Sequence, residues 1–360
     1  MLRVGLDATS HMNRVAGGIQ RFVANLLERV VPEDAEVSRG LDVRPLYRLS
    51  RFRQRARRHA GTLGRARWTW QHDSVLRRYD VAHGLDVRVP GPIAKVRVVT
   101  LHDLFSLMLA GYSTKKFVEG RLRRYADVAA HADFVTCDSD YTRRNAIELL
   151  GIPEERTRRI WLGVDERFRP EAAATAWRPE FGREPTGDFV LAVGPWDDRK
   201  NTHRLVEGFA RSELRGHARL VLAGKIDPNR PDVRACLRDN GLEDEVDLLG
   251  FVADEALPTL CARALVLCVP SRDEGFGLPV LEGMASGTAV ASSRAGSLTE
   301  VGGGHAALFD PDDPDELAAA LAIAARRGGD ALDAARRHAA SFTWERCAQE
   351  HVALWKELGG

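Results

Sequence analysis

The chain has 360 residues, of which 44% are hydrophobic and 29% are charged, and its formal net charge is +1. This length suits two domains, and the composition is that of a folded protein whose core is large enough to be stable without disulfides. No apolar run approaches the roughly 18 residues of a membrane-spanning helix, and residues Met1–Asp7 lack the pattern of a signal peptide. These features exclude integral-membrane, collagen-like and disordered classes and predict a cytoplasmic protein.

The cysteines and histidines give no indication of a metal site. There are five cysteines, an odd number with no C-x-x-C pair, and eleven histidines with no H-x-x-x-H spacing. The sequence therefore predicts free thiols in a reducing compartment and no structural metal.

The small net charge conceals two halves of opposite sign. Residues 1–170 carry a net charge of +11 and residues 171–360 carry −10, which favours two domains with different partners. Between Arg48 and Arg78, ten arginines accompany one acid, Asp73, although arginine outnumbers lysine 46 to 6 in the whole chain. Three interpretations stay open for this segment: peripheral contact with anionic lipid at the inner face of a membrane, contact with a phosphorylated acceptor, or a solvated helix face.

The first half begins like a βαβ unit. A short apolar run at Val4–Leu6 predicts a strand, Gly17 and Gly18 predict a turn, and the spacing of apolar residues over Ile19–Leu27 predicts a helix. The elements expected after these are a strand over Val96–Leu101, a helix over Phe117–His131 and a strand over Phe134–Cys137.

The second half repeats this alternation after a break. The polar stretch Arg169–Gly187 contains three prolines and predicts a linker. Strands are then expected at Phe189–Val193, Leu220–Ala223, Val246–Leu249, Ala264–Val269, Ala289–Ala291 and Ala306–Phe309, with a final helix over Ala339–Leu358. The pattern predicts an α/β protein of two doubly wound, Rossmann-like domains facing across a cleft at the carboxyl ends of their strands.

The densest motif runs from Ser271 to Glu282 and follows a predicted strand into a predicted helix. Gly275 and Gly277 leave backbone N–H groups accessible at the start of that helix, where an anion is favoured. Glu274 and Glu282 flank the turn, and each carboxylate can accept two hydrogen bonds from sugar hydroxyls. The alternative is that Glu274 caps the helix and Glu282 is solvated.

A basic pair, Arg199 and Lys200, follows the strand that ends at Val193. Two cations at a strand end can neutralise a diphosphate, and Lys200 is notable because the chain contains few lysines. The alternative is an exposed surface pair.

Three smaller motifs carry weaker predictions. Gly17 and Gly18 either let a phosphate or an acceptor approach the backbone or satisfy a loop that needs positive φ. His102 follows a strand end, where a histidine is either functional or structural. Ser297–Glu300 has the spacing of a capping box and is interpreted as structural.

Taken in order, these motifs resemble the retaining glycosyltransferases of family 4, which have the GT-B fold and use nucleotide-sugar donors. The matching segments are Gly17–Arg21, Thr100–Asp103, Cys137–Ser139, Gly194 with Arg199–Asn201, Ala223–Lys225, Leu249–Val252, Glu274–Glu282, Ala295–Glu300 and Phe342–Trp344. The resemblance implies an acceptor-binding domain over 1–170, a donor-binding domain over 171–340 and a helix over 341–360 that returns to the first domain.

The resemblance also implies a role for each matching residue. Arg199 and Lys200 would hold the donor diphosphate, Glu274 the donor sugar, and Glu282 the ribose. The residues implied at other parts of the donor are Gly275, Phe276, Gly277 and Leu278 through their amides, His102 near the reacting sugar, Gly17 and Gly18 near the diphosphate, and Lys225 and Val252 near the base. Some relatives carry arginine where this chain has Pro195, which leaves more of the phosphate charge to Arg199 and Lys200.

The expected function is metal-independent transfer of a hexose, with mannose from GDP-mannose favoured, to a glycan or lipid-linked acceptor with retention of configuration. We expect neither a cofactor nor a nucleic-acid partner. The alternative is a non-catalytic nucleotide-sugar-binding or scaffold protein of the same fold. A nicotinamide-dependent dehydrogenase is disfavoured because Val280 stands where its fingerprint needs glycine or alanine, and a phosphorylase because no lysine lies in a matching motif.

Overall fold

The computed structural model describes residues 1–12, 17–32, 34–48, 67–69, 79–91, 94–108, 115–178, 181 and 183–360. It divides into two compact units: Met1–Gly163 together with Phe342–Gly360, and Val164–Ser341. Most of the basic segment Arg48–Arg78 lies outside the described residues, so its three interpretations stay predictions.

The first unit is built on a seven-stranded parallel sheet with the order β3-β2-β1-β4-β5-β6-β7. The chain runs outward from β1 to β3 and then returns to the other side of β1, so the winding direction changes between β1 and β4. The strands are β1 (Leu2–Asp7), β2 (Leu41–Arg48), β3 (Arg67–Thr69), β4 (Tyr79–Gly84), β5 (Ala94–Leu101), β6 (Phe134–Cys137) and β7 (Thr157–Arg159).

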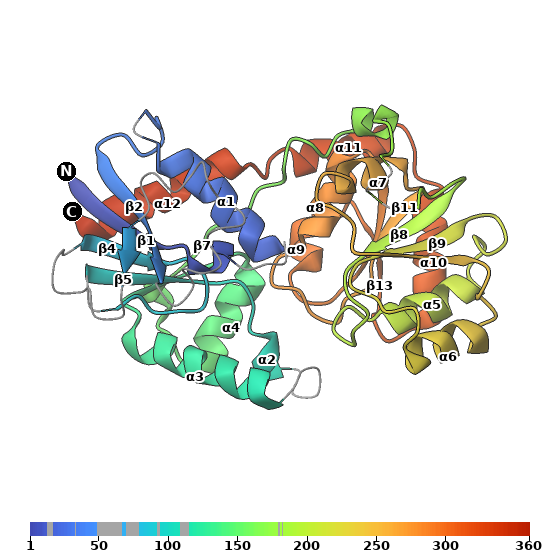
Figure 1. Cartoon of the computed structure of the whole chain (residues 1–360), viewed down its shortest axis with the longest axis horizontal. Coiled ribbons are helices and arrows are strands. Elements are labelled where there is room, and N and C mark those ends of the chain that lie inside the picture. Colours follow the sequence, from blue (N-terminus) through green and yellow to red (C-terminus); the bar gives the residue numbers. More distant parts are fainter. Residues whose placement is uncertain are drawn as a thin grey trace. The chain divides into compact units, whose positions relative to one another are not determined.

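Helices cover both faces of this sheet. In Figure 1, α1 and α12 lie on one side of it, and α3 and α4 lie on the other. The helices are η1 (Thr9–Met12), α1 (Gly18–Val30), α2 (Phe105–Met108), α3 (Lys115–His131), α4 (Asp140–Leu150), η5 (Glu154–Arg156) and α12 (Trp344–Gly359).

The last helix, α12, belongs to the first unit. Trp355 is fully buried there, and its indole Nε1 donates a hydrogen bond to Nδ1 of His83 in β4 at 3.1 Å. The return of the C-terminal helix to the first domain is thereby confirmed. Its predicted start at Ala339 is wrong, because α11 ends there and Thr343 caps a new helix by accepting a hydrogen bond from the Arg346 N–H.

The second unit has a six-stranded parallel sheet with the order β10-β9-β8-β11-β12-β13. Its strands are β8 (Phe189–Val193), β9 (Arg219–Ala223), β10 (Val246–Gly250), β11 (Val266–Val269), β12 (Ala289–Ser293) and β13 (Ala307–Phe309). Its helices are η6 (Pro170–Ala174), α5 (Thr202–Arg211), α6 (Pro231–Asp239), α7 (Leu257–Arg263), α8 (Leu278–Ala285), α9 (Leu298–Gly302), α10 (Pro314–Ala325) and α11 (Asp330–Ala339).

The main core of this unit lies between the sheet and α5, α6 and α10. Leu205 and Phe209 of α5 and Leu317 of α10 are fully buried against Val190 and Leu222 of the sheet. The helices α7, α8 and α11 lie on the opposite side (Figure 1). Two parallel sheets with helices on both faces confirm the predicted fold class.

The linker predicted over Arg169–Gly187 is wrong for its described residues. The stretch lies within the second unit, where η6 packs against α7. The Arg263 guanidinium of α7 donates hydrogen bonds to the carbonyl oxygens of Ala173 and Thr175, both at 2.9 Å. Arg263 therefore holds this polar stretch against α7, although the two are far apart in the sequence.

Candidate functional site

The carboxyl ends of β8 and β11 bring two of the sequence motifs together. These strands pair in parallel, so the loops that follow them leave the same edge of the sheet. The N–H of Arg272 in one loop donates to the carbonyl oxygen of Arg199 in the other at 2.8 Å. The basic motif and the acidic motif therefore form one site within the second unit.

Glu274 is the common partner in this site. Its Oε2 lies 3.2 Å from Nη1 of Arg199, its Oε1 contacts Nζ of Lys200, and Oε1 also accepts a 2.7 Å hydrogen bond from the Ser271 hydroxyl. Burial raises the pKa of Glu274, but the charges of Lys200 and Arg199 and the hydrogen bonds outweigh it and lower the pKa to about 2. The carboxylate is therefore ionised and holds both cations in place.

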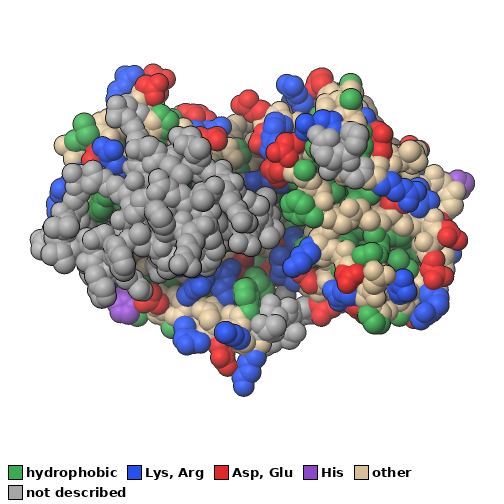
Figure 2. Space-filling model, in the orientation of Figure 1, with side chains coloured by type: hydrophobic (Ala, Val, Ile, Leu, Met, Phe, Trp, Pro, Cys, Tyr) green, Lys and Arg blue, Asp and Glu red, His purple; other side chains and the backbone are tan. Residues whose placement is uncertain are grey.

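The arginines on the surface of this unit are more exposed than the charged residues of that cluster. Figure 2 shows Lys and Arg beside Asp and Glu over the visible face of the second unit. A representative pair is Arg211 with Asp315 at 3.0 Å, whose side chains are 50% and 76% exposed, whereas those of Lys200 and Glu274 are 15% and 10% exposed. Arg199 and Lys200 are therefore not an exposed surface pair, and their role in binding a diphosphate stays a prediction.

The loop that carries Glu274 is held by the turn before α9. The carbonyl oxygen of Glu274 accepts hydrogen bonds from the N–H and the hydroxyl of Ser297, at 3.0 and 2.9 Å. Ser297 occupies the N-cap position of α9 but makes no side-chain cap hydrogen bond. The interpretation of Ser297 as a capping residue is therefore corrected: its hydroxyl supports the Glu274 loop.

Asn201 belongs to the family-matching segment Arg199–Asn201, but the sequence indicated no role of its own for it. It is fully buried with a φ of 56°, and its amide Nδ2 donates to the carbonyl oxygens of Pro270 and Pro311 at 3.0 and 2.6 Å. Asparagine adopts this left-handed conformation more readily than most residues. Asn201 therefore fixes the backbone next to Lys200, and an asparagine after two cations was the only signal for it.

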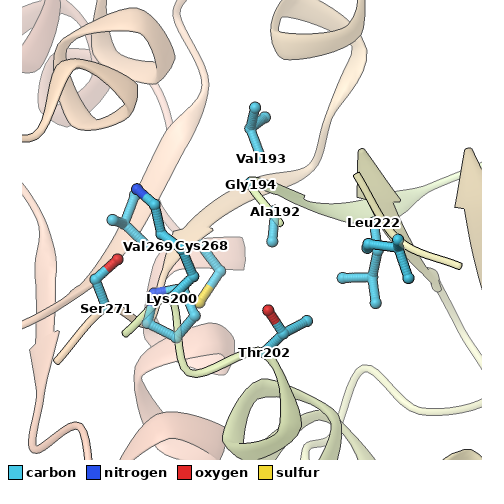
Figure 3. A pocket seen from close by; sticks show the side chains of 11 residues that line it. Ala192, Val193, Gly194, Lys200, Thr202, Leu222, Cys268, Val269 and Ser271 are labelled. Carbon is cyan, nitrogen blue, oxygen red and sulfur yellow. The ribbon is translucent and has the colours of Figure 1, made fainter. Parts of the chain in front are cut away.

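A small cavity lies beside Lys200, with a volume of about 20 Å³. Figure 3 shows Lys200 and Ser271 close together on one side of it and Leu222 on the other. That volume holds about one water molecule. The backbone is close-packed here, because a Cβ on Gly224 would lie 1.9 Å from the carbonyl oxygen of Gly194.

The helix α8 begins directly after the Glu274 loop. Its N-cap residue is Gly277, which has a φ of 96° and provides no side-chain cap. Glu274 therefore does not cap this helix, and Glu282, which is 4% exposed, is not solvated. Gly275, Phe276 and Leu278 are also buried in this segment. The structure therefore contradicts a capping Glu274 and a solvated Glu282, and the functional role of the motif stays a prediction.

The two residues expected near the base follow neighbouring strands. Lys225 is exposed after β9, and Val252 is buried after β10. The N–H of Gly224 donates to the carbonyl oxygen of Gly250 at 2.7 Å, which joins the two loops. Both lie at the same edge of the sheet as Glu274.

The remaining predicted residues lie in the first unit. The ring of His102 follows β5, with Nδ1 2.7 Å from Oδ2 of Asp138 and Nε2 3.1 Å from the carbonyl oxygen of Leu85. Gly17 is the N-cap of α1 with an extended φ of −165°, and Gly18 opens that helix. Neither glycine has the positive φ that the alternative interpretation required.

Within the described part of the chain, no group of three or more His, Cys, Asp or Glu side chains is arranged to hold a metal ion. No helix among the described residues has the length and apolar character needed to cross a membrane.

Comparison with known families shows which family this chain belongs to. The profile described as "Glycosyl transferases group 1" matches residues 174–337, and that of "Glycosyltransferase Family 4" matches residues 16–168. The D-inositol 3-phosphate glycosyltransferase of Geodermatophilus obscurus is 31% identical over 354 residues, which cover 90% of this chain and 77% of that protein. The chain belongs to the group 1, family 4 glycosyltransferases. The predicted enzyme class is thereby confirmed.

Other relatives of this glycosyltransferase are named as mannosyltransferases. The MMP alpha-(1->4)-mannosyltransferase of Mycolicibacterium hassiacum is 33% identical over 57% of this chain and 49% of its own, so the match spans about half of that relative. A GDP-mannose-dependent alpha-(1-6)-phosphatidylinositol dimannoside mannosyltransferase of Mycobacterium tuberculosis is 31% identical over 63% of this chain and 58% of its own.

Solved structures agree with the fold of this glycosyltransferase. Sucrose-phosphate synthase from Thermosynechococcus elongatus superposes with a TM-score of 0.72 at 21% identity, covering 99% of both chains. HepE of Anabaena, solved in complex with UDP and glucose, superposes with a TM-score of 0.71 at 18% identity, covering 99% of this chain and 100% of its own. At these identities the likeness shows the GT-B fold alone.

Proposed function

We propose that the chain transfers a hexose, with mannose favoured, from a nucleotide-diphosphate sugar to a glycan or lipid-linked acceptor, with retention of the anomeric configuration. The observation that carries this proposal is the cluster of Arg199, Lys200 and Glu274 at the carboxyl edge of the second sheet. The edge outside the carboxyl ends of parallel strands is where doubly wound sheets bind their ligands.

The chemistry of the leaving group explains why two cations belong there. When the bond between the anomeric carbon and the diphosphate breaks, the departing oxygen gains negative charge. Arg199 and Lys200, already held in position by Glu274, would stabilise that charge without reorganising. Preorganised donors of this kind contribute several kcal/mol to catalysis, so no metal ion is needed in the proposal.

The acidic motif supplies acceptors for hydroxyl groups. Glu274 would contact the donor sugar through its carboxylate, and Glu282, four residues into α8, would accept hydrogen bonds from the ribose. The amides from Gly275 to Leu278 open α8, where the helix dipole favours a phosphate or a hydroxyl oxygen.

GDP-mannose is the proposed donor, because relatives that match more than half of this chain are named as mannosyltransferases and one of them as GDP-mannose-dependent. In the proposed reaction the acceptor hydroxyl oxygen bonds to the anomeric carbon on the face that the diphosphate leaves. The acceptor proton passes to the departing phosphate oxygen, so the products are the glycoside and the nucleoside diphosphate.

Transfer from GDP-[¹³C]mannose to methyl α-mannoside in EDTA buffer tests this proposal. We expect release of GDP and formation of an α-linked disaccharide, identified by the carbon–proton coupling at the new anomeric centre. A β-linked product would contradict retention. Absence of transfer with GDP-mannose, when UDP-glucose under the same conditions yields a product, would contradict the proposed donor.

A further inference from the structure

The peptide group that joins Ser271 to Arg272 is held on both sides. Its carbonyl oxygen accepts a hydrogen bond from the Ser293 hydroxyl at 2.5 Å, and its N–H donates to the carbonyl oxygen of Arg199 at 2.8 Å. Because a peptide group is planar, its C=O and its N–H cannot turn independently of each other. A side chain that orients this C=O therefore also orients the N–H that meets Arg199.

The Ser293 hydroxyl has a defined direction. Ser293 is the last residue of β12 and is fully buried. Its oxygen also accepts from the N–H of Ala295 at 3.5 Å, and its single donor proton points to the carbonyl oxygen of Ser271. Since the side chain is buried, water does not compete for that proton.

The carbonyl group before this peptide is held from the opposite direction. The amide Nδ2 of Asn201, which follows the loop after β8, donates to the carbonyl oxygen of Pro270 at 3.0 Å. Two successive carbonyl groups of the loop after β11 are therefore held by side chains that come from its two neighbouring strands, β8 and β12.

The orientation of this peptide bears on the charged groups of the site. The guanidinium Nη1 of Arg199 lies 3.2 Å from Oε2 of Glu274 and 3.2 Å from the carbonyl oxygen of Asp273. The backbone of Arg199 is joined to the same loop through the N–H of Arg272. A rotation of the peptide would therefore move Arg199 relative to both acceptors of its side chain.

We propose that Ser293 is a positioning residue for sugar transfer. Its hydroxyl orients the peptide that follows Ser271, and that peptide keeps Arg199 beside Glu274. The part that concerns transfer rests on the proposed function, in which Arg199 stabilises the departing phosphate oxygen. The orientation of the peptide rests on contacts within the second unit alone.

The preceding residue, Ser292, provides a matched control. It is also a fully buried serine of β12, but its hydroxyl donates to the carbonyl oxygen of Ser293 at 3.3 Å and not to the loop after β11. Successive side chains of a strand point to opposite faces of the sheet. Ser292→Ala therefore removes a buried hydroxyl from the same strand without removing the contact to Ser271.

Binding of GDP and GMP to the full chain tests the positioning role. The departing oxygen belongs to the terminal phosphate of the diphosphate, which GMP lacks, so the ratio of the two affinities reports on the contacts of that phosphate. By calorimetric titration we expect Ser293→Ala to weaken GDP at least about fivefold, since one buried hydrogen bond is lost, and to leave GMP within about twofold. Ser292→Ala should leave both affinities within about twofold. A partly unfolded sample would change the stoichiometry of binding but not this ratio.

Three results would overturn the positioning role: unchanged GDP affinity in folded Ser293→Ala, an equal loss for GDP and GMP, or the same loss in Ser292→Ala. Failure of the proposed function is recognised separately, because the unaltered protein would then bind neither nucleotide.

Hydrogen exchange tests the orientation of the peptide without any ligand. In the unaltered full chain we expect slow exchange of the Arg272 amide, measured by mass spectrometry on proteolytic fragments that contain it, because its N–H is bonded to the Arg199 carbonyl. Ser293→Ala should speed this exchange at least about tenfold, and Ser292→Ala should leave it unchanged. Fast exchange of this amide in the unaltered protein would overturn the proposal even if Ser293→Ala failed to fold.

Discussion

Glu274 is the residue whose charge organises the site of the second unit. It contacts Arg199, Lys200 and Ser271. Glu274→Gln keeps the size of the side chain but removes its charge, so Arg199 and Lys200 lose the ionised carboxylate that both contact, and Lys200 should be held less firmly. We expect kcat for sugar transfer to fall about 10²–10³-fold, the usual cost of removing one preorganised group, with an unchanged circular dichroism spectrum.

The matched control for this substitution is Asp315→Asn. It also removes one carboxylate from an arginine pair in the same unit, but Arg211 and Asp315 are exposed. We expect transfer within twofold of the unaltered protein. If Glu274→Gln behaved like this control, Glu274 would have no part in the site.

Glu274 also predicts an acid-dependent loss of stability. Its pKa is lowered from an ordinary 4.5 to about 2, so its contribution to the free energy of unfolding is complete above pH 4.5 and disappears as the pH falls through about 2. The largest contribution is about 3 kcal/mol. Urea unfolding at a series of pH values should therefore show that the free energy of unfolding falls more steeply below pH 4.5 in the unaltered protein than in Glu274→Gln. Parallel curves would contradict the lowered pKa.

At the scale of residues, the sequence predicted the charged groups but not what supports them. Arg199, Lys200 and Glu274 stand out because cations and carboxylates follow predicted strand ends. Ser271 and Ser297 each open a motif in the sequence, but a contact of either with Glu274 was not predicted, because small hydroxyl residues are common in loops. Their role depends on neighbours that only the folded sheet brings within 3 Å.

The turn before α9 fixes the position of the loop that carries Glu274. Gly296 has a φ of 61°, and a Cβ there would lie 2.5 Å from the carbonyl oxygen of Glu274. Gly296→Ala should displace this loop and reduce transfer at least tenfold. Gly304 provides a control, since it has a φ of 81° and open space around its Cβ position. Gly304→Ala should cost only the left-handed strain of about 1–2 kcal/mol and keep its activity.

The helix α12 should be essential to the first unit. Trp355 is fully buried and donates to His83, so Trp355→Ala leaves both a cavity and an unpaired nitrogen. We expect a loss of about 3–5 kcal/mol in the free energy of unfolding of this unit, measured by urea denaturation. Ile323→Ala in α10 is the control, because Ile323 is 53% exposed and its removal should change stability by less than about 0.5 kcal/mol. Equal effects of the two substitutions would contradict the structural role of α12.

Among the elements, buried strands with continuous apolar runs were predictable. Strands in which charged residues, histidine or proline interrupt the apolar residues were not. The strand β6 was predicted with its observed bounds, Phe134–Cys137. The strand β2 was missed because Arg44 and Pro45 interrupt its apolar residues, and β4 because Asp80 and His83 do. The side chains of Asp80 and His83 are nonetheless buried, since each has a partner elsewhere in the first unit.

At the scale of the whole molecule, the sequence predicted the two-domain architecture because the strand–helix alternation restarts after Gly187. The structure shows that the chain returns to the first unit at Phe342, shortly before α12 begins. A helical period indicates which face of a helix is buried, but not which sheet covers that face. The resemblance to family 4 supplied that part of the prediction.

The proposed function requires that the second unit binds a nucleoside diphosphate through Arg199 and Lys200. Calorimetric titration of the full chain with GDP, UDP, ADP and dTDP in EDTA buffer tests it most directly, with Lys200→Ala measured beside the unaltered protein. We expect selective binding of GDP that weakens at least tenfold in Lys200→Ala. Binding of none of the four nucleotides, or equal affinity in the variant, would contradict the claim.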